Sequence, residues 1–201
     1  MPIQAISFDF DGTLVQPGWR TLRMLPAVLR RRGALLHIQS AIERLRLSPR
    51  RHPDIHRAII VEAAKHSHLA PAVLQEALED DLDRAFPRAI RDAPSPAPID
   101  ALIKRCDEIG IPRVIVSDHP AIEKLRLRGG PAGWAAVISC RALGALKPLP
   151  DGLWAAAAQL GVPISALLHV GDRWETDGNA AAAAGCLFAH LSQADRLRRM
   201  I

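Results

Sequence analysis

The second half of the chain alternates between short apolar runs and amphipathic segments, and this alternation strongly constrains the fold. Between residues 99 and 189, apolar runs of strand length are separated by segments with helical periodicity. Strands joined through helices need crossover connections, which give a parallel sheet with helices on both faces. The expected strands are Arg113–Ser117, Ala135–Ile138, Leu167–Val170 and Cys186–Ala189, and the expected helices are Ile99–Ile109, Ala121–Leu127, Gly152–Leu160 and Asp177–Ala184.

One more strand is expected at the start of the chain. The apolar run Ile3–Phe8 leads directly into Asp9-Phe10-Asp11-Gly12, which is typical of a buried strand that stops at a glycine turn. The fold class is therefore α/β, with a parallel sheet flanked by helices.

The segment between these two regions has helical patterns only. Apolar residues recur at helical spacing from Leu22 to Leu78, and Pro49, Pro53 and Pro71 separate about four helices. The proline-rich stretch 93–98 then predicts a stiff, non-helical linker. We therefore expect a core domain formed by residues 1–15 and 93–201, and an all-helical domain formed by residues 16–92.

Charge is distributed unevenly between these parts. Residues 16–91 contain 14 Lys and Arg against 8 Asp and Glu, whereas the rest of the chain contains 12 against 13. A basic face can attract nucleic acid or small anions, but a solvated helix surface is the commoner case, so nucleic-acid binding is not expected.

The cellular setting is predicted from what the sequence lacks. No apolar run approaches the ~20 residues needed to cross a bilayer, and no basic segment precedes an apolar one near Met1. We expect a cytoplasmic protein with no membrane partner. The widely spaced Cys106, Cys140 and Cys186 are expected to be reduced, buried thiols rather than a disulfide framework or a zinc site.

Polar residues follow the predicted strands in a way that indicates a common site. Ligands bind beyond the carboxyl ends of the strands in an open parallel sheet. Asp9 and Asp11 follow the first strand, Ser117 ends the second, and Asp172 follows the fourth. Lys147 lies in the loop after the third.

This set of residues fits phosphoryl transfer that depends on Mg²⁺. Asp9 and Asp172 offer the hard oxygen ligands that Mg²⁺ prefers, and Asp9 can attack phosphorus to form an aspartyl phosphate. Asp11 can protonate the leaving oxygen and later deprotonate the attacking water. Ser117 and Lys147 can hold the transferred oxygens.

The same residues resemble a known family. Asp9-Phe10-Asp11-Gly12-Thr13-Leu14 resembles the first motif of the haloacid dehalogenase-like (HAD) hydrolases. Ser117, Lys147-Pro148 and Gly171-Asp172 with Asp177 are similar to the second, third and fourth motifs, in the same order.

The resemblance implies a Rossmann-like core and a cap of the family's first type, here residues 16–92, that closes over the substrate. It also implies that the main-chain carbonyl of Asp11 is a metal ligand and that Asp177 supports the metal waters or Lys147. The metal-site residues would then be Asp9, Asp11, Asp172 and Asp177, and the catalytic residues Asp9, Asp11, Ser117 and Lys147.

Within the family, Asp11 favours a phosphatase or a phosphomutase, since the dehalogenase branch lacks an acid at this position. The expected function is hydrolysis of a small phosphorylated metabolite. The alternatives are a phosphomutase and a catalytically weak binding or regulatory protein. Asp118 departs from the family pattern, because it stands where asparagine often follows the second-motif hydroxyl and adds a negative charge.

Overall fold

The computed structural model describes residues 2–201, and its central element is a five-stranded parallel sheet. The strand order is β3-β2-β1-β4-β5, so the first strand lies in the middle. Each apolar run predicted as a strand does form one. The strands are β1 (Ala5–Phe8), β2 (Arg113–Ser117), β3 (Ala136–Ser139), β4 (Leu167–Gly171) and β5 (Leu187–His190).

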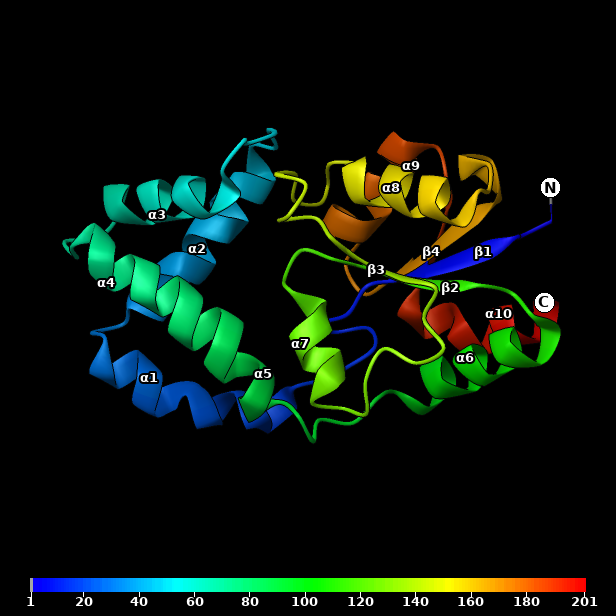
Figure 1. The fold of residues 1–201 in the computed structure, drawn as a ribbon, viewed down its shortest axis with the longest axis horizontal. Helices are drawn as coiled ribbons and strands as arrows, with labels where there is room; N and C mark the ends of the chain where they lie inside the picture. The colour runs from blue at the N-terminus through cyan, green and yellow to red at the C-terminus, as the bar shows by residue number, and fades with distance from the viewer. Residues whose placement is uncertain (1) are drawn as a thin grey trace.

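Helices cover both faces of the sheet, as the alternation predicts (Figure 1). Side chains alternate between the faces of a strand, so Ile6 packs with one group of helices while its neighbour Ala5 packs with the other. The first face carries α6 (Ala97–Ile109), α7 (Ala121–Arg126) and α10 (Ala194–Met200), and the second carries α8 (Asp151–Leu160) and α9 (Asn179–Ala184).

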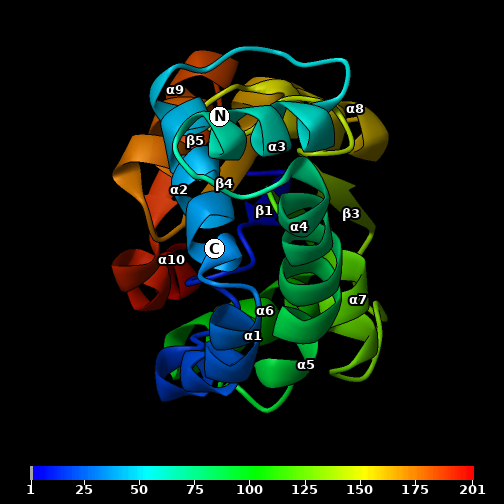
Figure 2. The same cartoon turned by 90° about the vertical axis from the view of Figure 1, so that its left-hand side faces the viewer.

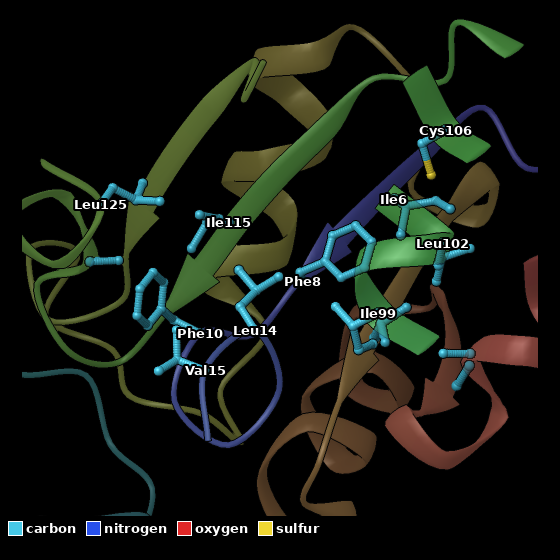
Figure 3. Packing of buried hydrophobic residues seen from close by; sticks show 14 of the residues in the cluster. Ile6, Phe8, Phe10, Leu14, Val15, Ile99, Leu102, Cys106, Ile115 and Leu125 are labelled. Atoms are coloured by element: carbon cyan, nitrogen blue, oxygen red, sulfur yellow. The ribbon is translucent and has the colours of Figure 1, made fainter. Parts of the chain in front are cut away.

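Figure 3 shows the packing on the first face, where Phe8 and Ile115 from the sheet meet Leu102 of α6. Phe10, Leu14 and Val15, from the loop after β1, extend the same cluster toward α7. The loop that carries Asp9 and Asp11 is therefore anchored by its own apolar residues.

The named elements between β1 and α6 are all helices, and they have an apolar cluster of their own. We call residues 18–89 the helical insert. Figures 1 and 2 show its helices gathered beside the sheet-containing part. Its elements are η1 (Gly18–Met24), α1 (Leu25–Arg30), α2 (Ala34–Leu47), α3 (Ile55–Lys65), and the continuous run of α4 (Pro71–Glu76), η2 (Ala77–Ala85) and α5 (Phe86–Ala89).

Several predicted boundaries are wrong. Helix α6 begins at Ala97, inside the expected linker, because Pro98 occupies the first turn, where a helix tolerates proline. Helix α9 begins at Asn179 rather than Asp177, after a wider π-helical turn, η4 (Trp174–Gly178). Short 3₁₀ turns precede β4 and follow β5, at η3 (Ile164–Ala166) and η5 (Leu191–Gln193).

Other features agree with expectation or add to it. The final helix α10 had no prediction. The three cysteines are free, and Cys106 and Cys140 are buried as expected, but Cys186 is only partly buried. None of the helices in residues 2–201 is long and apolar enough to cross a membrane.

Candidate active site at the carboxyl edge of the sheet

The six residues predicted from the sequence line one cavity. A hollow of about 180 Å³ lies at the carboxyl edge of the sheet. Its walls include Asp9, Asp11, Ser117, Lys147, Asp172 and Asp177. Residues that are up to 168 positions apart in the chain therefore meet because parallel strands end at the same edge.

Lys147 is the central cation of this cavity. Its ammonium donates to Asp9 Oδ1 at 2.6 Å and to Asp177 Oδ1 at 2.5 Å, and all three side chains are nearly inaccessible to solvent. Burial alone would lower the pKa of Lys147, but the carboxylates around it, Asp9 first among them, raise it well above its ordinary value. Lys147 is therefore held in its charged form.

The acidic residues outnumber this cation. Ligand atoms of Asp9, Asp172 and Asp177 all lie within 4.8 Å of one another. Burial raises the pKa of Asp9 to about 7, an effect that Lys147 only partly offsets and that the charge of Asp177 reinforces. The pKa of Asp172 is raised too, by burial and by Asp177. The cluster thus carries unbalanced negative charge that a cation would neutralise.

Asp177 is an exception within this cluster. Burial alone would raise its pKa, but the Lys147 ammonium and a hydrogen bond with His169 hold the pKa well below its ordinary value. His169 Nε2 lies 3.3 Å from Asp177 Oδ1, and its Nδ1 lies 2.9 Å from Ser7 Oγ. The backbone N–H of Arg173 also donates to Asp177, at 3.1 Å.

Two glycines make room for the acidic side chains. A Cβ on Gly12 would overlap the carboxylate of Asp172, and one on Gly171 would overlap that of Asp177. Gly12 also has a φ of +96°, which disfavours any residue with a Cβ. The absence of a side chain at Gly12 and Gly171 thus allows the Asp172 and Asp177 carboxylates to lie directly against the backbone.

The donor set fits a magnesium ion. Mg²⁺ is usually held by one or two carboxylates together with waters and substrate phosphates, rather than by a complete protein cage. The Asp9 and Asp172 carboxylates supply such oxygens beside an open cavity. Asp9, Asp172 and Asp177 together could therefore hold a metal.

The side chain of Asp11 lies apart from this cluster. Its Oδ2 accepts a hydrogen bond from the Lys124 ammonium, and its Oδ1 is buried without a hydrogen-bond partner among the described residues. Asp11 also lines a second hollow, of about 300 Å³, between the loop after β1 and the helical insert.

Ser117 stands at the end of β2 and is buried. Its Oγ accepts a hydrogen bond from the backbone N–H of His119 at 3.3 Å, which fixes the hydroxyl at the cavity wall. The imidazole of His119 lines both hollows, and burial lowers its pKa well below the ordinary value.

The structure also accounts for the additional charge of Asp118. Its Oδ1 accepts the backbone N–H of Lys147 at 2.9 Å, and its Oδ2 accepts from Arg46 Nε and Nη2 at 3.0 and 2.7 Å. Burial alone would lower the pKa of Arg46, but Asp118 and Glu43 raise it. An arginine of the insert therefore neutralises the extra carboxylate.

Sequence reasoning missed several side chains that belong to this region. Lys124 and Arg46 had no signal that set them apart from other basic residues. The same holds for the ion pair in which Arg173 donates to both carboxylate oxygens of Glu43, each at 3.0 Å. These contacts join α2 to the sheet edge, and only the tertiary structure shows them.

A larger hollow of about 650 Å³ lies within the insert and contains none of the predicted site residues. Its walls carry four arginines, two of which pair with Asp81 and Asp92. We place the candidate site at the smaller cavity because the chemically suited groups converge there.

Comparison with known sequences finds a family match. A sequence model described as "haloacid dehalogenase-like hydrolase" matches residues 3–185. No curated protein matches the chain at a significant level.

Solved structures of similar fold span three activities. A 2-haloacid dehalogenase from Pseudomonas syringae pv. Tomato is 18% identical, with a TM-score of 0.64 over 99% of this chain and 100% of that one. A HAD phosphatase from Thermococcus onnurineus is 20% identical, with a TM-score of 0.61 over 96% and 97%. A β-phosphoglucomutase from Clostridium difficile is 15% identical, with a TM-score of 0.67 over 92% and 83%.

Proposed function

This chain belongs to the haloacid dehalogenase-like hydrolase family, and we propose that it is a magnesium-dependent phosphatase that hydrolyses a small phosphomonoester through an aspartyl phosphate. One observation carries the proposal: Asp9 and Asp11 line the same cavity as Lys147 and Ser117. A nucleophile, an acid and two groups that bind oxygen are what phosphoryl transfer requires.

In the first step, a carboxylate oxygen of Asp9 attacks phosphorus and the bond from phosphorus to the leaving oxygen breaks. Asp11 gives its proton to that oxygen, so the product leaves as an alcohol. Lys147 and Ser117 hold the oxygens of the transferred group. Mg²⁺, bound by Asp9, Asp172 and the main-chain carbonyl of Asp11, would offset the charge between the phosphate and the attacking carboxylate.

In the second step, water attacks phosphorus while Asp11 takes its proton. The bond between phosphorus and the Asp9 oxygen breaks, which releases inorganic phosphate and restores Asp9. Asp177 keeps Lys147 in place through the ion pair described above.

Asp11 is also the reason to favour a phosphatase over a dehalogenase. A halide leaving group needs no proton, whereas an alkoxide does. An acid that lines the cavity wall fits the second case.

We also propose that residues 16–92 form a cap that closes over the substrate. The second hollow, which extends from Asp11 to the insert residues Ile42, Leu82 and Phe86, offers space for the part of the substrate beyond the phosphate. Its size suits a small metabolite.

The test is phosphate release from a panel of phosphorylated metabolites, with Mg²⁺ or with EDTA, for the wild type and Asp9→Asn. We expect release that requires Mg²⁺ and that falls by roughly 10⁴-fold or more in Asp9→Asn, since removing a nucleophile removes the reaction path. Glu175→Gln, an exposed change nearby, serves as a matched control and should retain activity. A folded wild type that releases no phosphate from any compound would overturn the proposal.

A further inference from the structure

The ammonium of Lys124 is buried in an unusual setting. Lys124 belongs to α7, and its side chain is 2% exposed. Lysine is seldom buried without a partner, because removing an ammonium from water costs several kcal/mol. Here the partner is Asp11 Oδ2.

Two aromatic rings complete the surroundings of this ammonium. Lys124 Nζ lies 5.3 Å from the ring centroid of Phe10 and 5.5 Å from that of Phe86. Both distances suit a cation–π contact. Phe10 follows β1 and Phe86 begins α5 of the insert, and Figure 1 shows α5 beside α7. The ammonium thus sits where the loop of Asp11 meets the insert.

The ion pair leaves the two oxygens of Asp11 in different states. Oδ2 is taken by Lys124, whereas Oδ1 is buried and has no hydrogen-bond partner in the described part of the chain. Asp11 lines both hollows of the site, and Lys124 lines neither. Lys124 therefore contacts the Asp11 carboxylate from outside the two hollows and does not reach the substrate space.

We propose that Lys124 is a positioning residue that fixes the Asp11 carboxylate so that Oδ1 faces the leaving group. Without the ammonium, the carboxylate can rotate about its side-chain bonds, and the proton-carrying oxygen is no longer held at one place. A misplacement of about 1 Å at a reacting group can cost 10²-fold in rate. The catalytic consequence rests on the proposed function, but the positional claim does not.

The first arm of the test is structural. Crystal structures of the wild type and Lys124→Met are compared at the Asp11 side chain. We expect Asp11 to leave its wild-type rotamer, or to occupy more than one, in the variant. An Asp11 that keeps a single wild-type rotamer in Lys124→Met overturns the proposal, whether or not the protein hydrolyses phosphate esters.

The second arm uses the dependence on the leaving group. Activity with saturating Mg²⁺ is measured on p-nitrophenyl phosphate, whose leaving group needs little protonation, and on phenyl phosphate, whose leaving group needs more. We expect Lys124→Met to lower kcat/KM, which reports on the first step alone, by about 10- to 100-fold on phenyl phosphate and by less on p-nitrophenyl phosphate. Asp11→Asn should likewise lose more activity on phenyl phosphate than on p-nitrophenyl phosphate.

The double variant Lys124→Met/Asp11→Asn separates positioning from general damage. Two residues that act as one unit give non-additive losses, so the double variant should be no slower than Asp11→Asn alone. The proposal is overturned if kcat/KM falls equally on both substrates, if the losses of the two single variants multiply in the double variant, or if kcat/KM on phenyl phosphate is unchanged or raised in Lys124→Met.

Control variants show whether the effect is specific to Lys124. Arg126→Met changes an exposed cation on the same helix, and it should leave the rotamer of Asp11 and both rates unchanged. If Lys124→Met does not fold, Lys124→Leu is used instead, since its apolar side chain also packs between the rings and cannot donate a hydrogen bond to Asp11. If the wild type releases no phosphate, the proposed function fails, and the structural arm still decides the position of Asp11.

Discussion

Two ion-pair networks in this molecule each contain a buried carboxylate, but they differ in how that buried charge is balanced. At the sheet edge, the single ammonium of Lys147 faces the carboxylates of Asp9 and Asp177, with Asp172 close by. In the insert, Asp81 is fully buried between Arg30 and Arg31. Arg31 also binds Asp80 and Glu76, and Asp80 binds Arg84 as well.

In the insert network three guanidinium groups face four carboxylates, Glu79 included, but the one fully buried carboxylate, Asp81, is matched by both Arg30 and Arg31. Every buried charge there has a partner, and the network joins α1 to the long helical run α4–η2–α5. The site network has three carboxylates and one cation, and the pKa of Asp9 is raised to about 7 as a result of burial and this imbalance. Unbalanced buried charge is costly to keep and is therefore a stronger indication of function than the number of ion pairs.

Removing Lys147 should give the largest effect, because it leaves two carboxylates buried and unpaired. We expect Lys147→Met to lower kcat by at least about 10²-fold and the free energy of unfolding by about 3–5 kcal/mol. Urea denaturation in EDTA and phosphate release measure the two effects. Lys147→Met/Asp177→Asn should recover part of the stability but none of the activity. A stable, active Lys147→Met would show that the charge of Lys147 among these carboxylates is not needed for catalysis.

The charge imbalance also predicts a pH dependence of stability in the absence of metal. The pKa of Asp9 is raised in the folded state, from 3.8 to about 7, so the folded state holds this proton more tightly than the unfolded state. Stability from this group is complete below about pH 4 and is lost as pH rises toward 7, by roughly 2–4 kcal/mol. Asp9→Asn should remove this fall.

Magnesium should oppose the same loss. A cation that binds only the folded state adds about 2.7 kcal/mol when its concentration is 100 times its Kd. We expect MgCl₂ to raise the midpoint of urea unfolding more at pH 8 than at pH 5. If MgCl₂ has equal effects at the two pH values, or the same effect in Asp9→Asn, then Mg²⁺ does not stabilise the protein by binding at the acidic cluster.

The insert network gives the matched comparison. Arg31→Met should lower the free energy of unfolding by about 1–3 kcal/mol, since Arg30 still pairs with Asp81. We expect kcat to stay at the wild-type value, because none of these residues lines the candidate cavity. A large loss of kcat in a folded Arg31→Met would mean that the two networks are coupled.

The smallest effect is expected at the contact between the two regions. Glu43 and Arg173 are both about half exposed, at 47% and 42%, and exposed ion pairs contribute less than about 1 kcal/mol. Glu43→Gln should leave stability almost unchanged and raise KM by about two- to fivefold. The change in KM should shrink in high salt, where such pairs are screened. A KM that does not respond to this change would argue against a closing role for the insert.

The sequence was sufficient for the sheet and for the residues at its carboxyl edge. Each apolar run forms a strand. The hydrophobic periodicity, and the place of each polar residue at or after a strand end, were enough to predict that Asp9, Ser117, Lys147 and Asp172 lie in one cavity. The helical content of the insert was also predictable, because its periodicity and its prolines are local signals.

The partners of these residues could not be predicted in the same way. Arg46 meets Asp118 across 72 positions and Lys124 meets Asp11 across 113. Pairs of this kind depend on how helices pack against the sheet, and nothing in the sequence distinguishes Arg46 from the other arginines of the insert. The start of α6 was missed for a different reason, since Pro98 fits a first helical turn as well as a linker.

The central place of β1 has a consequence for how the chain is made. Its two neighbours, β2 and β4, begin at Arg113 and Leu167, so a growing chain carries β1 with both edges unpaired while the whole insert is synthesised. Nearly all of the apolar cluster of the insert comes from residues 18–89, which are complete before β2 is made, whereas the sheet must wait for more distant segments. Asp9 thus leaves the ribosome 168 residues before Asp177, and its surroundings are complete only after Asp177 has followed it.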